Sequence, residues 1–179
     1  MNRTQLRFEN MQQIVGGEGI ALVLLTDMSR TRALTVVCDE QMMYQLLMRI
    51  KNPTLCRTML PETLLSMLTS KYELMVFGLY EGQYQVALMD DQGKSSRIRM
   101  SDAVLLTLIS DIPLYIEDNL MARQSVPYDE NAKGIAIPIN TMDLPRLKMA
   151  LQNAIAEENY ELASQLRDEI KRRSDSSQK

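Results

Sequence analysis

Short apolar runs and amphipathic segments alternate along the first 140 residues of the chain. Three runs rich in valine, leucine and isoleucine have the composition of strands, at Leu6–Phe8, Ile20–Thr26 and Ala33–Cys38. A helical period then spans Met42–Ile50, and it ends before Pro53 because proline disfavours helical geometry in the residue that precedes it. We expect three strands followed by a helix.

A second helix is predicted from Pro61, since proline is well tolerated in the first turn of a helix. Two strands follow at Tyr72–Tyr80 and Tyr84–Met89, joined by a short turn that contains glycine. A further strand through Arg97 and Arg99 would place both arginines on one face of the sheet before the next helix begins. This order of elements predicts an α+β fold with a mixed, largely antiparallel sheet and packed helices.

The last part of the chain predicts a C-terminal hairpin of two short amphipathic helices. Apolar residues recur at three- and four-residue spacing before and after the acidic turn Glu157–Asn159, and Asn159 is suited to cap the second helix. Two helices of this length bury little apolar area by themselves, so their apolar faces require a further partner. The residues expected to bind that partner are Leu151, Ile155, Tyr160 and Leu166.

The residues of this hairpin, Ala154–Ala163 followed by Leu166–Ile170, resemble the UVR motif of the UvrB and UvrC excision-repair proteins. The resemblance implies a helical hairpin that makes protein–protein contacts, sometimes with a second copy of itself, and it implies no repair chemistry. The alternative from periodicity alone is a hairpin that only caps the preceding domain. We expect an α+β domain over residues 1–140, the hairpin over 141–174 and a frayed tail over 175–179.

The composition is that of a globular protein, with 45% hydrophobic and 24% charged residues. No apolar run approaches the roughly 20 residues of a membrane span, and Cys38 and Cys56 suggest no disulfide framework, so we expect a soluble, cytoplasmic protein. Residues 1–142 carry 13 Lys and Arg against 16 Asp and Glu, a balance that counts against tight DNA binding. Gly16–Gly19 lies between two predicted strands and lacks the lysine of a phosphate-binding loop, so it is interpreted as a hairpin loop.

A second resemblance lies upstream of the hairpin. Arg99–Leu106, followed by Ile112–Ile116, is similar to the signature of the bifunctional nuclease (BFN) family, and the similarity covers residues 5–125. Some members of that family carry a UVR hairpin behind the BFN domain. The resemblance implies a compact α+β domain, a homo-oligomer, and nuclease activity toward DNA, RNA or both.

The chain departs from the BFN pattern at positions where chemistry would lie. The family's Thr-His-Asp-Leu falls on Leu60–Thr63, Met100 replaces a proline, and Arg97 replaces an acidic residue. The turn ahead of a Glu-Ala helix is also altered, at Cys38–Met42. Histidine is absent from all 179 positions, which removes the side chain best suited to proton transfer near neutral pH. A histidine-based nuclease mechanism is therefore excluded.

Metal-assisted hydrolysis remains, in which carboxylates hold Mg²⁺ or Mn²⁺ and an arginine neutralises charge on the phosphoryl oxygens. Ser101 and Asp102 match the BFN signature, and Arg99 would clamp a phosphate with its planar fork. The structural alternative is that Ser101 or Asp102 caps a helix, Arg99 pairs with Asp102, and the other acids are solvated. The candidates are Asp102, Ser101 and Glu62 for catalysis, Arg99, Arg97 and Arg57 for substrate binding, and Asp102, Glu62 and Glu40 for the metal, with Asp39 as a further available ligand.

Three functions from different classes are consistent with the sequence. The leading one is a metal-dependent nuclease of the BFN family that acts on nucleic acid and is tethered to a protein partner by the hairpin. The second is a noncatalytic adaptor or scaffold that has lost nuclease activity, favoured by the missing histidine and the acidic balance. The third is a regulator that binds an anionic metabolite in a pocket beside Arg97 and Arg99.

Overall fold

A computed structural model describes residues 2–13, 20–130, 139 and 142–176 of the protein. The chain divides into two compact units, residues 1–78 with 84–136 and residues 137–179 with the turn at 79–83. The predicted domain boundary after residue 140 and the predicted loop Gly16–Gly19 lie outside the described residues.

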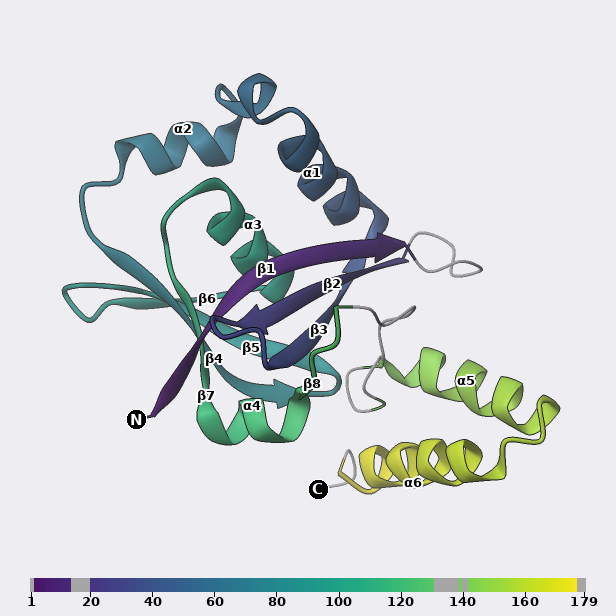
Figure 1. Ribbon diagram of the computed structural model, residues 1–179. Helices are drawn as coiled ribbons and strands as arrows, with labels where there is room; N and C mark the ends of the chain where they lie inside the picture. Colours follow the sequence, from purple (N-terminus) through teal and green to yellow (C-terminus); the bar gives the residue numbers. More distant parts are fainter. Residues whose placement is uncertain (1, 14–19, 131–138, 140–141, 177–179) are drawn as a thin grey trace. The chain divides into compact units, whose positions relative to one another are not determined.

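The larger unit is built on one sheet (Figure 1). Its strands are β1 (Arg3–Gln13), β2 (Ile20–Asp27), β3 (Arg32–Asp39), β4 (Tyr72–Tyr80), β5 (Gln83–Asp90), β6 (Ser95–Ile98), β7 (Leu114–Glu117) and β8 (Val126–Pro127). Within the described residues the strand order is β6-β5-β4-β7-β1-β2-β3-β8. The pairs β1–β2, β1–β7, β2–β3, β3–β8 and β5–β6 are antiparallel, and β4–β7 is parallel. The predicted mixed, largely antiparallel sheet is confirmed.

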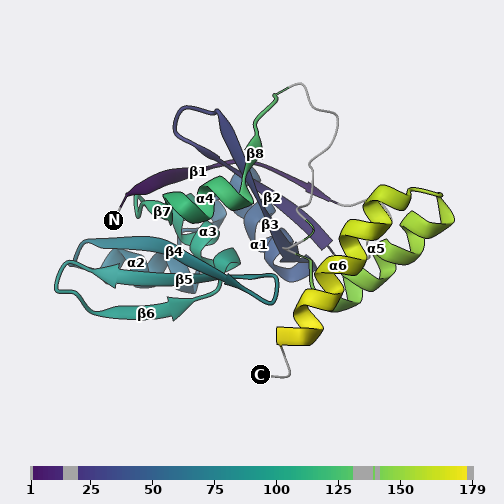
Figure 2. The same ribbon diagram turned by 90° about the horizontal axis from the view of Figure 1, so that it is seen from below.

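Helices cover both sides of the central strands. The larger unit carries α1 (Glu40–Lys51), α2 (Leu60–Met67), α3 (Met100–Ile109) and α4 (Asp118–Gln124), and the 3-10 helix η1 (Pro53–Cys56) lies between α1 and α2. Figures 1 and 2 show α1 and α3 on one side of strands β1–β3 and α4 on the other, with α2 at the outside of the α1–α3 layer. In consequence Ala21–Leu25 of β2 is buried along its whole length.

Local sequence explains where these elements begin and end. Asp39 caps α1, because its Oδ1 accepts a hydrogen bond of 2.7 Å from the backbone N–H of Met42. The predicted β4–β5 hairpin is confirmed, and Glu81 and Gly82 both adopt positive φ, 49° and 80°, as a tight two-residue turn requires. Helix α2 has Pro61 in its first turn.

One predicted strand is wrong in its extent. Strand β6 ends at Ile98, and Arg99 is the N-cap of α3. The carbonyl of Arg99 accepts a 3.0 Å hydrogen bond from the N–H of Ala103, the first bond of the helix, so Arg99 cannot continue the strand ladder. Arg97 and Arg99 therefore do not share a strand face.

The smaller unit contains the predicted helical hairpin, formed by α5 (Leu144–Ala156) and α6 (Tyr160–Ser176). Helix α6 extends to Ser176, two residues into the segment predicted as a frayed tail, and the remainder of that segment lies outside the described residues. Among the helices that the structure describes, each is too short or too polar to cross a membrane.

Candidate functional site

The N-termini of α1 and α3 carry several of the predicted catalytic residues. Glu40 is exposed in the first turn of α1, directly after the cap Asp39. Asp102 lies in the first turn of α3 and accepts two hydrogen bonds from Arg99, with an Nε–Oδ2 distance of 2.7 Å and an Nη2–Oδ1 distance of 3.1 Å. Ser101 precedes Asp102 and is half-buried. This bidentate pair was expected if Arg99 and Asp102 have a structural rather than a catalytic role.

Electrostatic effects connect the two helix ends. The hydrogen bond and the charge of Asp102 raise the pKa of Arg99, and the charge of Asp39 adds to the shift. Burial raises the pKa of Cys38 to about 12, and the charges of Asp39 and Asp102 contribute. The pair of Arg99 and Asp102, together with Asp39, whose charge acts on Arg99, is named here the Arg99 cluster. Cys38 keeps its proton at neutral pH and is no nucleophile.

Arg99 is the cationic member of the Arg99 cluster, and it is accessible. Its side chain is 69% exposed, against 30% for that of Asp102. A guanidinium held by a carboxylate on one edge still presents N–H donors on its other edge, which suits a phosphate or another carboxylate. The cluster can therefore bind an anion through Arg99 without first losing the pair to Asp102.

Glu62 forms an ion pair with Arg49, away from Arg99 and Asp102 in sequence. Its carboxylate accepts hydrogen bonds from Arg49 of α1, with an Nε–Oε1 distance of 2.6 Å and an Nη2–Oε2 distance of 3.0 Å. The Arg49 side chain is 2% exposed, and its Nη1 donates to the carbonyl and the side chain of Gln45. This nearly buried pair attaches α2 to α1, which is a structural role.

The predicted metal ligands do not form a common site. Asp102 is paired with Arg99, Glu62 is paired with Arg49, and Glu40 lies at the start of α1. No group of three or more Cys, Asp or Glu side chains suited to a metal ion occurs in the part of the chain that the structure describes. As placed, these residues do not fit a three-carboxylate magnesium or manganese centre. The bound metal stays a prediction.

The predicted substrate-binding arginines come from three separate elements. Arg57 follows η1, Arg97 lies on β6, and Arg99 begins α3. All three are exposed. Strand β6 is the edge of the sheet, so Arg97 stands at the rim of the larger unit. The arginines are available to anions in solution, and only Arg99 belongs to the cluster with Asp39 and Asp102.

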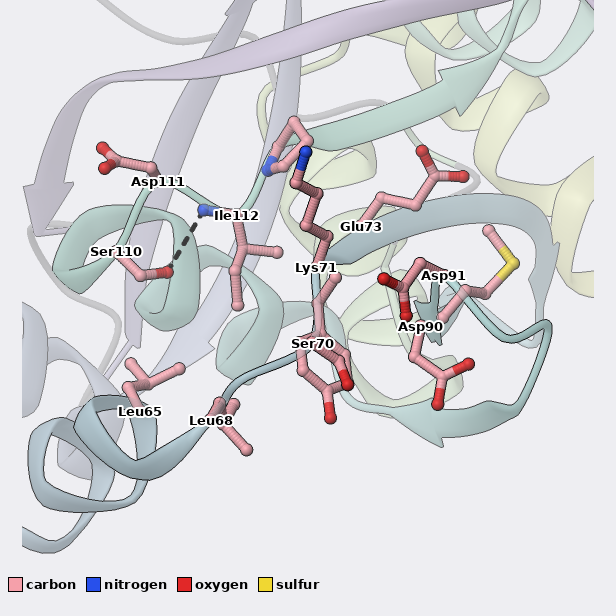
Figure 3. Close-up of a pocket in the computed structure, with 13 residues that line it drawn as sticks. Leu65, Leu68, Ser70, Lys71, Glu73, Asp90, Asp91, Ser110, Asp111 and Ile112 are labelled. Atoms are coloured by element: carbon pink, nitrogen blue, oxygen red, sulfur yellow. Dashed lines mark hydrogen bonds between the residues drawn. The ribbon is translucent and has the colours of Figure 1, made fainter.

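The sequence did not indicate a cleft of about 770 Å³ at one end of the larger unit (Figure 3). Leu65, Leu68 and Ile112 form part of its apolar wall. Its carboxylates are Glu73, Asp90, Asp91 and Asp111, against one cation, Lys71. Arg97 and Arg99 are not among its lining residues, so this acidic cleft does not match the anion pocket predicted beside them.

The helical hairpin of the smaller unit has its own core. The buried residues are Leu147 and Ala154 of α5 and Ala163 and Leu166 of α6. Leu151 is half-buried and packs against them. Leu166, predicted to bind a partner, is 1% exposed and therefore holds the two helices together. Ile155 and Tyr160, also predicted to bind a partner, lie outside this core.

Two large apolar side chains flank the turn of the hairpin. Ile155 at the end of α5 is 55% exposed, and Tyr160 at the start of α6 is 70% exposed. Glu157, Glu158 and Glu161, all exposed, lie between or beside them. Ile155 and Tyr160 with these three glutamates are named the tip surface. It combines two apolar anchors with an acidic surround.

The predicted cap of α6 is confirmed. The N–H of Leu162 donates to the side-chain oxygen of Asn159 at 3.2 Å, and the N–H of Ala163 donates to its carbonyl at 3.0 Å. Asn159 thereby fixes the direction in which α6 leaves the turn.

The comparisons with known proteins concern this same hairpin. The model of the UVR family, described as the UvrB/uvrC motif, matches residues 144–173, which span α5 and most of α6. No match was found among curated proteins. The BFN resemblance of residues 5–125 stays a prediction. The C-terminal hairpin of this chain is thus a UVR motif, as its sequence predicted.

Proposed function

We propose that this protein is an interaction protein whose UVR hairpin binds another protein through the tip surface. The observation that carries the proposal is the division of the hairpin's apolar residues. Leu147, Ala154, Ala163 and Leu166 close its core, whereas Ile155 and Tyr160 stay outside it.

The tip surface has the character of a small binding site. Tyrosine is enriched among the residues that dominate binding energy, and an exposed isoleucine adds apolar area beside it. Glu157, Glu158 and Glu161 surround the two anchors with negative charge. The partner is therefore expected to offer an apolar groove with a basic rim, since complementary charge favours the correct encounter.

Quantitative capture from a cell extract tests this function. The immobilised full chain is compared with an Ile155→Ser/Tyr160→Ser double variant and with Met28→Ser, whose side chain is 56% exposed in the larger unit. We expect a defined set of proteins to be retained by the parent and by Met28→Ser and lost from the double variant. Loss from neither variant, or equally from both, would contradict the proposal.

A second candidate is the BFN-type nuclease, and the Arg99 cluster is the observation that favours it. Arg99 pairs with Asp102 at the start of α3, the charge of Asp39 at the start of α1 acts on Arg99, and Arg99 remains accessible to a phosphate. Arg99 would hold the phosphoryl oxygens, Ser101 would position the substrate, and Asp102 would orient the guanidinium. Glu62 has no part in this scheme because Arg49 holds its carboxylate.

Cleavage of labelled single-stranded DNA and RNA tests the second candidate. The parent is assayed with Mg²⁺, Mn²⁺ or EDTA beside Asp102→Asn and beside Asp111→Asn, an exposed acid of the acidic cleft. A nuclease predicts cleavage by the parent and by Asp111→Asn and none by Asp102→Asn. Equal activity in all three preparations, or none in any, would rule out this role for Asp102.

A further inference from the structure

Helix α2 of the larger unit presents an apolar stripe to the outside. Leu60, Leu64 and Met67 follow the i, i+4, i+7 spacing of one helix face, and Leu68 ends the helix beside them. These four side chains, named the α2 face, are 71%, 53%, 72% and 45% exposed. No residue of α2 is buried. Among the residues that the structure describes, none covers this apolar face.

The α2 face carries no charge of its own. The one charged residue of the helix is Glu62, and buried Arg49 neutralises it through the two hydrogen bonds of 2.6 and 3.0 Å. In a contact around a twofold axis each patch meets its own copy, so a charged patch would repel itself. An uncharged stripe of leucine and methionine is complementary to itself.

The surroundings of the two ends of the α2 face have opposite charge. Exposed Arg57 lies three residues before Leu60, at the N-terminal end. The C-terminal end leads into the acidic cleft, where Leu65 and Leu68 lie on the same wall and Asp90 and Asp91 stand across from them (Figure 3). The charge pattern of this surface therefore runs from basic to acidic along the helix.

We propose that the α2 face is the contact between two copies of this chain, packed antiparallel around a twofold axis near Leu64. Antiparallel packing brings Arg57 of each copy toward the acidic cleft of the other copy, whereas parallel packing would place like charges together. This contact is separate from the tip surface of the hairpin and does not rest on its function.

The size of the surface also favours the antiparallel arrangement. An eight-residue helix is about 12 Å long, and alone it provides less than the roughly 800 Å² that each partner contributes to a stable interface. With antiparallel packing the wall of the acidic cleft extends the contact at both ends of the helix pair. Both parts of the surface belong to the larger unit.

Sedimentation equilibrium of the full chain at increasing concentration tests the contact. We expect a dimer that Leu64→Glu weakens by more than about thirtyfold in Kd, the effect of a central interface residue. Met28→Glu, at a side chain that is 56% exposed in the parent and outside the α2 face, serves as the control and leaves the dimer intact. A parent that stays monomeric, which would assign the face to a different partner, or a dimer weakened equally by Met28→Glu and Leu64→Glu, overturns the proposal.

Cysteine cross-linking tests the position of the axis. Leu64→Cys is compared with Met28→Cys, since the two parent side chains are 53% and 56% exposed and the native Cys38 and Cys56 are buried. A residue near a twofold axis approaches its own copy closely enough for a disulfide. Covalent dimer from dilute Leu64→Cys and not from Met28→Cys supports the contact, and equal yields oppose it.

Charge reversal tests the orientation. Arg57→Glu and Asp91→Arg should each raise the Kd of the dimer about fivefold to tenfold, and the double variant should restore it. Circular dichroism of each variant verifies that the fold is kept, as expected for exposed positions. Single variants without effect on the Kd would exclude the antiparallel arrangement.

Discussion

At the scale of single residues, the ion pair with Arg49 gives Glu62, which was predicted for catalysis, a structural role. Arg49 occupies the buried face of α1, following Met42 and Leu46 at helical spacing. An arginine in that position must have a partner because an unpaired buried charge is costly. The helical spacing of α1 indicates that Arg49 is buried, but it does not indicate which carboxylate pairs with it.

We predict that Glu62→Gln lowers the free energy of unfolding by about 2–4 kcal/mol, because it leaves the buried Arg49 charge without a counterion. Glu40→Gln changes an exposed side chain at the start of α1 and should cost less than about 1 kcal/mol. Urea denaturation of both variants measures the difference. Equal costs would show that Glu62 is not a structural ion-pair partner.

The lowered pKa of Asp27 makes the free energy of unfolding depend on pH. Burial alone would raise its pKa, but hydrogen bonds from the backbone N–H of Arg32, the hydroxyls of Ser29 and Thr31 and the N–H of Thr31 lower it to about 2. The unfolded chain binds a proton near pH 4, so the unfolded state holds more protons between pH 4 and pH 2. The stabilisation by Asp27 is present above pH 4 and is lost as the pH falls toward 2.

We expect Asp27→Asn to be less stable than the parent at pH 7 by on the order of 1 kcal/mol, discounted for partial solvation. This difference should shrink between pH 4 and pH 2. Urea midpoints at several pH values measure it. A constant difference down to pH 2 would show that the charge of Asp27 has no role.

At the scale of the elements, the turn between α5 and α6 explains how the hairpin closes. The N–H of Asn159 donates to the carbonyl of Ala154 at 2.8 Å, and the N–H of Glu158 donates to that of Ile155 at 3.1 Å. These are the two bonds of a Schellman motif, and Glu158 occupies its left-handed position with φ 58°. Glycine is the usual residue there, so the sequence did not predict this turn type.

We predict that Glu158→Gly stabilises the hairpin by about 0.5–1 kcal/mol, since glycine adopts positive φ without steric cost. Glu157→Gly is the matched control. Glu157 has φ −88°, so glycine there only adds freedom to the unfolded chain and should destabilise the hairpin. Amide exchange of α5 and α6 reads out both effects. The same sign for both variants would contradict this account of the turn.

The core of the hairpin gives a second prediction at this scale. Leu166→Ala should cost about 2–5 kcal/mol because it opens a cavity between the helices, whereas Ile155→Ala should change stability by less than about 0.5 kcal/mol. Amide exchange of α5 and α6 again supplies the measurement. A large loss in Ile155→Ala would mean that Ile155 supports the hairpin and is not free for a partner.

At the scale of the whole molecule, the fold followed from the sequence more completely than the candidate site did. Runs rich in valine, leucine and isoleucine located the strands around Ile20–Thr26 and Ala33–Cys38, and Asn159 was identified as a cap. The pairing of β7 with both β1 and β4 could not be predicted, since these contacts join distant segments. The site depended on such long-range contacts.

The predicted site residues show the same limit. Arg99 and Asp102 are three residues apart at a helix start, and their pairing was among the expected alternatives. The use of Glu62 by Arg49 and the burial of Leu166 in the hairpin core depend on which faces meet in space. Periodicity identifies an apolar face, but it does not indicate whether that face packs against the same chain or against a partner protein.

The proposed function requires that the hairpin tip bind a protein partner. Hydrogen–deuterium exchange of the full chain, measured alone and in complex with the protein that it captures, shows where that partner contacts the chain. We predict slower exchange in the complex at the tip surface around Ile155 and Tyr160, with the Arg99 cluster unchanged. Unchanged exchange at the tip, with protection confined to the larger unit, would contradict the account.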